Sequence, residues 1–259
     1  MTCPKCRSTG IILCLLLFFP AQPSFAEPPR TQDPVSIFYK AALYYEMGKY
    51  HEAVTQYSSL LALGVESGPI YYNLGNCYFK KGNLGRAILN YEKGKRIIPR
   101  DGDLISNEEY AKALVRENPG EPSRTWYQKI ADEIFDSVSI DELTILLSTT
   151  YLLSIMILIA GFYLGPVKRY QKILLTVLVL IFAMSGLGFY KKNSLLGKEA
   201  IVIEEKSEAK FEPFDRATVH FILCEGREVQ ILTSMRDWVK IKREDKKAGW
   251  VKASSIEIF

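Results

Sequence analysis

A repeat of 34 residues is the feature that most restricts the folds open to this chain. Four residues return with that one spacing: Tyr44, Gly48, Ala53 and Tyr57 recur as Tyr78, Gly82, Ala87 and Tyr91. A constant period near this length is typical of stacked helical hairpins, in which each hairpin buries a face only by packing on its neighbour. Arrays of this kind usually present a binding surface for other proteins. The repeat therefore predicts an all-α interaction domain.

The second copy, residues 68–101, resembles a tetratricopeptide repeat. The residues that carry the resemblance are Tyr71, Leu74, Gly75, Tyr78, Gly82, Ala87, Tyr91, Gly94 and Pro99. Gly75 and Ala87 are small where two helices cross, and Gly82 permits the turn between them. The first copy, residues 34–67, matches less well, because Ala41 stands in for Gly75 and Val65 for Pro99. We expect two repeats over 34–116, closed by a capping helix from Asp103 with Leu104, Tyr110, Ala111 and Leu114 as its packing stripe.

The first 26 residues have the pattern of an export signal. Lys5 and Arg7 precede a short apolar run, Ile11 to Phe19, and Ser24-Phe25-Ala26 supplies a small-x-small cleavage pattern. We expect cleavage after Ala26, with an uncleaved anchor as the alternative. This signal places the repeats outside the cytoplasm.

Two uncharged runs follow a linker and an amphipathic helix expected over 117–142. The first run, 143–167, has 25 residues and follows a capping-box pattern at Ser139 and Glu142. The second, 173–190, has 18 residues, which span about 27 Å as a helix. Both are candidate transmembrane helices, and a buried soluble hairpin is the alternative.

Charge alone does not orient these spans. Basic residues occur between them and also after the second: Lys168, Arg169 and Lys172, then Lys191, Lys192 and Lys198. The export signal decides the matter, so we expect a bacterial inner-membrane protein whose repeats and C-terminal tail are both periplasmic.

The tail, residues 200–259, changes to a strand pattern. Five β-rich runs are separated by turn residues: 200–203, 218–223, 229–232, 238–241 and 249–251. Their order resembles a bacterial SH3-like domain, a small all-β barrel. The residues that carry this resemblance are Glu225-Gly226, Asp237-Trp238-Val239-Lys240-Ile241, Gly249-Trp250-Val251 and Ile256.

The sequence offers little for catalysis. The chain has only two histidines, His51 and His220, and neither has the spacing of a metal site. No phosphate-binding loop or nucleophile elbow is present. The net charge of +4 is not gathered into a basic face, so we expect no nucleic-acid partner. We predict a protein that is not an enzyme and needs no cofactor or metal.

Two surfaces are candidate binding sites. The first is a groove lined by the first helix of each hairpin, with Phe38, Tyr45, Glu46, Tyr72, Asn76, Phe79 and Lys80. Asn76 and Lys80, one helical turn apart, would suit a peptide backbone or a C-terminal carboxylate, although asparagine is also common at this position of such repeats. The second is a patch on the tail domain formed by Phe211, Phe214, Trp238 and Trp250. The alternative is that its tryptophans belong to the core.

The order of signal, repeats, two spans and SH3-like tail resembles the E-type (BatE) proteins of the Bat aerotolerance family. The most specific stretch runs from Tyr71 to Asp103. The resemblance implies a non-enzymatic membrane scaffold that acts beside membrane proteins with von Willebrand A domains and a MoxR-type ATPase, in envelope stress tolerance. The alternative reading is a peptidoglycan-binding or envelope-sensing protein that acts through its tail domain.

Overall fold

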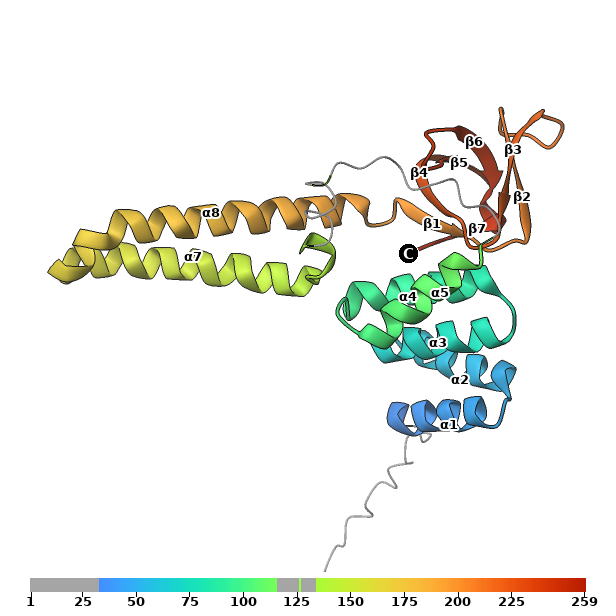
Figure 1. The fold of residues 1–259 in the computed structure, drawn as a ribbon, viewed down its shortest axis with the longest axis horizontal. Helices are drawn as coiled ribbons and strands as arrows, with labels where there is room; N and C mark the ends of the chain where they lie inside the picture. Colours follow the sequence, from blue (N-terminus) through green and yellow to red (C-terminus); the bar gives the residue numbers. More distant parts are fainter. Residues whose placement is uncertain (1–32, 116–125, 127–133) are drawn as a thin grey trace, which may run out of the picture. The chain divides into compact units, whose positions relative to one another are not determined.

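The computed structural model describes residues 33–115, 126 and 134–259. The predicted signal, the linker at 117–122 and most of the amphipathic helix after it lie outside the described residues. The described elements include five short α-helices, two long α-helices, an antiparallel sheet and a short 3-10 helix, Ala253–Ser255 (Figure 1).

The short helices form two hairpins and a closing helix. They are α1 (Pro34–Glu46), α2 (Tyr50–Ala62), α3 (Gly68–Lys80), α4 (Leu84–Ile97) and α5 (Gly102–Ala113). The two helices of each hairpin are joined by the same type of turn. Its glycine, Gly48 in the first hairpin and Gly82 in the second, has a positive φ of 73° and 78° respectively. The hydrogen bond from Lys49 N–H to Tyr44 O (2.9 Å) returns as that from Asn83 N–H to Tyr78 O (3.0 Å). The 34-residue sequence repeat is therefore also a repeat of the backbone conformation and its hydrogen bonds.

Small residues allow the helices of each hairpin to cross closely. A Cβ atom at Gly75 would lie 2.4 Å from Cε1 of Tyr91, so the ring occupies the space that a side chain would need. The equivalent pair of the first hairpin, Ala41 and Tyr57, is also buried. The predicted roles of these positions are confirmed.

The closing helix α5 begins at Gly102, one residue before its predicted start at Asp103. The Asp101 carboxylate caps it by accepting a hydrogen bond of 2.9 Å from Leu104 N–H. Leu104 and Ala111 are buried, as predicted, but Tyr110 and Leu114 are exposed. Two of the four residues predicted to pack therefore do so.

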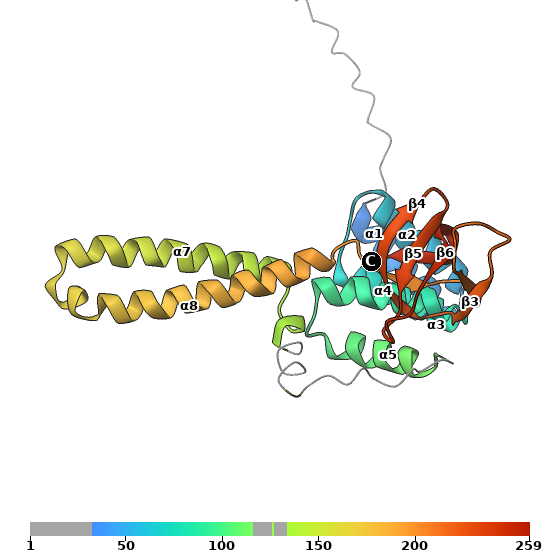
Figure 2. The same cartoon turned by 90° about the horizontal axis from the view of Figure 1, so that it is seen from above.

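The two long helices, α7 (Ile140–Tyr163) and α8 (Gly165–Leu195), pack side by side as a hairpin (Figure 2). The capping box is confirmed: Ser139 Oγ accepts from Glu142 N–H at 3.1 Å, and the Glu142 carboxylate accepts from Ser139 N–H at 2.9 Å. The first helix ends before residue 167, because Leu164 is extended and Gly165 starts the next helix. Residues 168–172, expected as the connection, are therefore helical.

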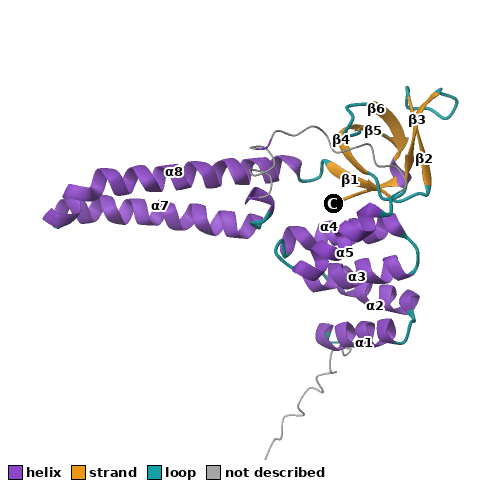
Figure 3. Ribbon diagram, viewed as in Figure 1, coloured by secondary structure: helices purple, strands orange, loops and turns teal. Residues whose placement is uncertain are grey.

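The tail forms an antiparallel sheet (Figure 3). Its strands are β1 (Glu199–Val202), β2 (Lys206–Lys210), β3 (Val219–Cys224), β4 (Glu228–Met235), β5 (Trp238–Lys242), β6 (Ala248–Lys252) and β7 (Ile256–Ile258). The order is β3-β2-β6-β5-β4-β1-β7, with β3 and β7 at the two edges. The described ladders thus form an open sheet, and the closed SH3-like barrel stays a prediction. Two of the strands, β2 and β7, were not expected.

The sheet packs on the second hairpin. Ile201 and Phe259 share one apolar core with Ile88 and Leu89 of α4 and with Leu104 of α5. The Arg96 guanidinium lies 4.5 Å from the centre of the Phe259 ring. A continuous core therefore joins the end of the repeats to the β domain.

Candidate protein-binding face of the repeats

The predicted groove residues lie on α1 and α3, the first helices of the two hairpins. Helix α3 contacts both α1 and α5, so these three helices follow one another in space. Glu46 and Lys80 are exposed, whereas the other five predicted residues are half-buried: Phe38, Tyr45, Tyr72, Asn76 and Phe79. We call the predicted residues, together with Asn107 and Tyr110 of α5, the first-helix face.

Asn76 is at the centre of a hydrogen-bond network within this face. Its Oδ1 accepts from Tyr91 Oη–H at 2.7 Å and from Asn107 Nδ2–H at 3.0 Å. Asn107 Nδ2 also lies 3.2 Å from Tyr72 Oη, an acceptor for its second hydrogen. The network joins α3, α4 and α5. Both hydrogen bonds that the Asn76 oxygen accepts come from side chains of the protein. Only the amide N–H groups of Asn76 remain for a ligand at this position.

Aromatic rings make up much of the rest of the face. The Phe38 ring packs edge-to-face against Tyr57 with centroids 5.5 Å apart, and Tyr45 packs similarly against Tyr50 at 5.4 Å. Phe79 lies 5.8 Å from Tyr110. Pairs of this kind hold each ring in one orientation and leave an edge or a face for a partner. The face is therefore rigid and amphipathic.

The ionisable groups under the face are held neutral. Burial raises the pKa of Tyr57 to about 12 and also raises the pKa of Tyr45 and Tyr91. Burial likewise raises the pKa of the Cys77 thiol to about 12, so this cysteine is a poor nucleophile near neutral pH. The formal charges of the predicted set are those of Glu46 and Lys80 alone. The chemistry of the face is thus suited to binding.

Asn107 and Tyr110 belong to this face and were not predicted as binding residues. Tyr110 was assigned to the packing of α5, but 61% of its surface is exposed. The sequence could have indicated these two residues, because α5 follows the second hairpin as the first helix of a third, incomplete hairpin. Such a helix should expose binding residues on the same face as α1 and α3 do.

The second predicted surface lies on the β domain. Trp238, Lys240, Trp250 and Lys252 pair across β5 and β6, on the face opposite the buried Val239 and Val251. Both tryptophans are half-buried, and the ammonium groups of Lys210 and Lys240 lie 5.9 Å from the Trp238 and Trp250 rings respectively. Phe211 and Phe214 are exposed in the β2–β3 loop. Neither tryptophan belongs to the apolar core of the sheet.

The described part of the chain contains no group of three or more His, Cys, Asp or Glu side chains placed to hold a metal ion. The His51 ring lies on the surface of α2, with Nδ1 3.3 Å from the Lys81 ammonium. The His220 ring stacks 4.3 Å from Phe211. His220 thus packs against a neighbouring ring of the β domain, whereas His51 is a surface residue.

Comparison with known families agrees with the repeat geometry. Residues 41–82 match the family described as TPR repeat, and residues 69–101 match the family described as Tetratricopeptide repeat. A comparison of the chain with curated proteins finds no match. Repeats of this type are typically protein-interaction modules. Residues 41–101 of this chain therefore contain tetratricopeptide repeats, which indicates a role in binding other proteins.

Proposed function

We propose that this protein is a non-enzymatic membrane scaffold that displays its repeats to partner proteins in the periplasm. The observation that carries the proposal is the exposure of the long hairpin. Only 11% of the most apolar window of each long helix is buried. A core hairpin of a soluble protein would be mostly covered, whereas lipid-facing helices keep apolar side chains on their outside.

The hairpin has polar ends on both sides of its apolar length. The capping box and Lys191 lie at one end, and Lys168 and Lys172 lie at the other. With an exported N-terminus, two spans return the chain to the outer face, so the repeats and the β domain share the periplasm. Their common core of Ile201, Phe259 and α4 supports placing them on one side of the membrane. This topology is part of the proposal.

The partner site that we propose is the first-helix face. Its aromatic rings supply apolar area, and Lys80 and the Asn76 amide supply donors for an extended peptide or for a carboxylate. The most suitable partners are envelope proteins anchored in the same membrane, including the von Willebrand A proteins implied by the Bat resemblance. Sharing one membrane raises the local concentration of two weakly binding proteins. A Bat-type envelope-stress complex is the setting we propose.

Capture from membranes tests this function. The full chain, purified in detergent, should retain specific inner-membrane proteins, and Lys80→Glu combined with Phe79→Ala should abolish their retention. Lys206→Glu on the exposed side of β2 is the charge-matched control and should retain them. Loss of partners in the control, or an unchanged set of partners in the double variant, would rule out the first-helix face.

A second candidate function is binding of peptidoglycan by the β domain. It is favoured by one observation, the placement of Trp238 and Trp250 on one outward face with lysines between them. Stacking tryptophans and ammonium groups suit sugar rings that carry carboxylates. The full chain in detergent should sediment with purified cell wall, and Trp238→Ala should remove this binding. Trp126→Ala, which changes an exposed tryptophan outside the sheet, is the control. Equal sedimentation of both variants would exclude the candidate.

A further inference from the structure

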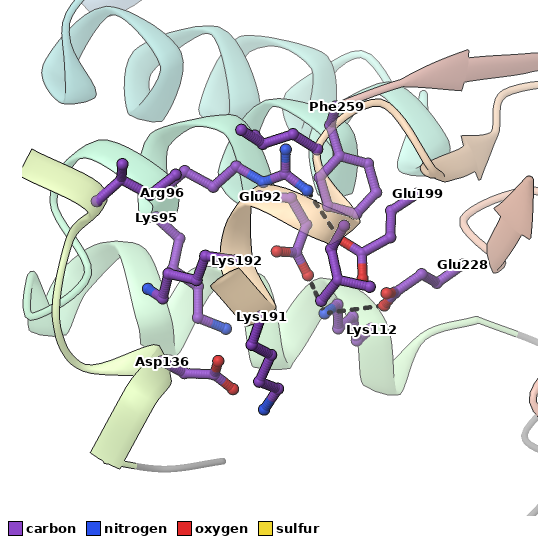
Figure 4. Close-up of a pocket in the computed structure, with 13 residues that line it drawn as sticks. Glu92, Lys95, Arg96, Lys112, Asp136, Lys191, Lys192, Glu199, Glu228 and Phe259 are labelled. Atoms are coloured by element: carbon purple, nitrogen blue, oxygen red, sulfur yellow. Dashed lines mark hydrogen bonds and ion pairs between the residues drawn. The ribbon is translucent and has the colours of Figure 1, made fainter. Parts of the chain in front are cut away.

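A cavity of about 530 Å³ lies between the second hairpin, α5, the sheet and the end of α8 (Figure 4). This volume is within the range of small-ligand sites, about 300–1,000 Å³. Five cationic side chains line it: Lys95, Arg96, Lys112, Lys191 and Lys192. Four carboxylates also line it: Glu92, Asp136, Glu199 and Glu228. Charges of both signs, in nearly equal number, suit a ligand that also carries both.

The cavity lies at the end of the apolar hairpin. Lys191 and Lys192 directly follow the uncharged run that ends at Tyr190, and Ile140 is the first residue of α7. The Lys192 ammonium donates a hydrogen bond to the Val138 carbonyl, so the ends of both long helices border the cavity. If α7 and α8 span a bilayer, these residues lie at the depth of the phospholipid headgroups, where lysines at helix ends normally lie.

Charges of opposite sign are separated across the cavity. Lys95, Lys191 and Lys192 lie on one side with Asp136, and Glu199 and Glu228 lie on the other (Figure 4). Arg96 pairs with Glu199 at 2.8 Å, and Lys112 reaches Glu228 only at 4.0 Å. Glu199 thus has a close ion pair with Arg96, whereas the contact between Glu228 and Lys112 is long.

Like charges repel within each side. Burial raises the pKa of Glu199, and the negative charge of Glu228 raises it further, although Arg96 opposes both effects. On the other side, Lys191 and Lys192 are adjacent in sequence and both line the cavity, with Asp136 as the carboxylate beside them (Figure 4). A phosphate beside the lysines and an ammonium beside the carboxylates would relieve both repulsions.

We propose that this cavity binds the headgroup of a zwitterionic aminophospholipid of the phosphatidylethanolamine type. The phosphate lies toward Lys191 and Lys192, and the primary amine lies toward Glu199 and Glu228. The inference rests on the proposed function, because it needs α7 and α8 in the membrane, and it adds a ligand that the scaffold role does not require. The lipid would fasten the repeat and β domains to the membrane surface in one orientation.

Native mass spectrometry of the full chain tests this proposal. Protein purified in detergent is mixed with equal amounts of phosphatidylethanolamine and phosphatidylglycerol. Wild type should retain phosphatidylethanolamine preferentially, and Lys192→Gln should lower its retention about tenfold, the effect of one lost charge-assisted contact. Lys172→Gln, at the opposite end of α8, is the matched control and should bind as wild type does. Soluble phosphoethanolamine should compete for the site and inorganic phosphate should compete less.

Three results would overturn the inference: equal retention of the two lipids, unchanged retention in Lys192→Gln, or binding of soluble phosphoethanolamine without binding of the lipid. Glu228→Gln is a second variant that keeps the side-chain shape, and it should lose the preference for the amine-bearing lipid. This variant decides the matter if Lys192→Gln does not fold. Alkaline extraction of membranes separates the two proposals. A chain released by alkali contradicts the membrane scaffold, whereas a chain that stays in the membrane and ignores the lipid contradicts only the headgroup site.

Discussion

The Glu225 carboxylate accepts a hydrogen bond of 2.8 Å from the backbone N–H of Gly85. Gly85 is in the first turn of α4, whose N–H groups have no partner within the helix and attract negative charge. Glu225 comes from the turn between β3 and β4. The β domain thus supplies a cap to a repeat helix, over a separation of 140 residues along the chain.

A side chain at position 85 should weaken the contact between the first turn of α4 and the β domain. A Cβ atom there would lie 2.4 Å from the Val202 carbonyl oxygen, and backbone cannot move aside as a flexible side chain can. We expect Gly85→Ala to lower the free energy of unfolding by about 1–3 kcal/mol, as overpacking of a close contact does. Chemical denaturation of the full chain in detergent measures this change.

Gly102→Ala is the control for that substitution. Gly102 lies in the first turn of α5, and nothing lies within 4 Å of the Cβ it would gain. The variant should be as stable as wild type or slightly more stable, because alanine restricts the unfolded chain. If Gly85→Ala behaves like Gly102→Ala, the repeats and the β domain are not held together by this contact.

Much of the helical fold could be predicted because its signals are local. The turn glycines, the small residues at helix crossings and the capping box at Ser139 each act within one hairpin or one helical turn. The strand β2, by contrast, has the sequence Lys-Ser-Glu-Ala-Lys, whose inward residues Ser207 and Ala209 are too small to form an apolar alternation. The strand β7 is only three residues long. Both strands depend on partners that are distant in sequence.

The candidate site could be predicted only in outline. Helical periodicity places Tyr72, Asn76 and Phe79 on one side of α3, but it does not show which of their polar atoms are already used. The Asn76 oxygen is occupied by Tyr91 and Asn107, and the Asn107 contact depends on where α5 packs. The cavity beside α8 combines residues from six separate segments, so no local pattern indicated it.

The hydrogen bonds of Asn76 give this candidate binding residue a structural role as well. Asn76→Ala should lower the free energy of unfolding by about 1–3 kcal/mol, because the Tyr91 hydroxyl, which is buried, loses its partner. Adding Tyr91→Phe removes the stranded hydroxyl, so the double variant should be less unstable than the sum of the two single changes. A double-mutant cycle by urea denaturation measures this coupling. Additive effects would show that the two residues do not interact.

Glu92 should make stability depend on pH. Burial raises the pKa of Glu92 from its ordinary value of 4.5 to about 7, and the nearby carboxylates of Glu108 and Glu228 add to the effect, while Lys112 opposes it. A raised pKa means that the folded protein favours the protonated acid. This contribution to stability is therefore present below pH 4.5 and is lost as the pH rises to about 7.

Replacing Glu92 by glutamine should remove this dependence. Glutamine resembles the protonated acid at every pH, so the stability of Glu92→Gln relative to wild type should rise between pH 5 and pH 8, as measured by urea midpoints. Glu109→Gln, which changes an exposed carboxylate of α5, is the control and should follow the wild-type curve. A difference between Glu92→Gln and wild type that does not change with pH would contradict the assignment.

In the proposed two-span arrangement, the end of the β domain lies on the same side of the membrane as the repeats. Alkaline phosphatase fused through a linker after Phe259 should therefore be active, because this enzyme needs the oxidising periplasm to form its disulfides. The same enzyme fused after Tyr170, in the segment between the two apolar runs, should be inactive. Phe259 packs under the Arg96 guanidinium, so the linker must leave that contact intact, and wild-type protease resistance of the fusion checks that it does. An inactive fusion at Phe259 together with an active one at Tyr170 would reverse the topology. In that case the basic residues at 168–172 would lie outside the cytoplasm, against the usual distribution of positive charge.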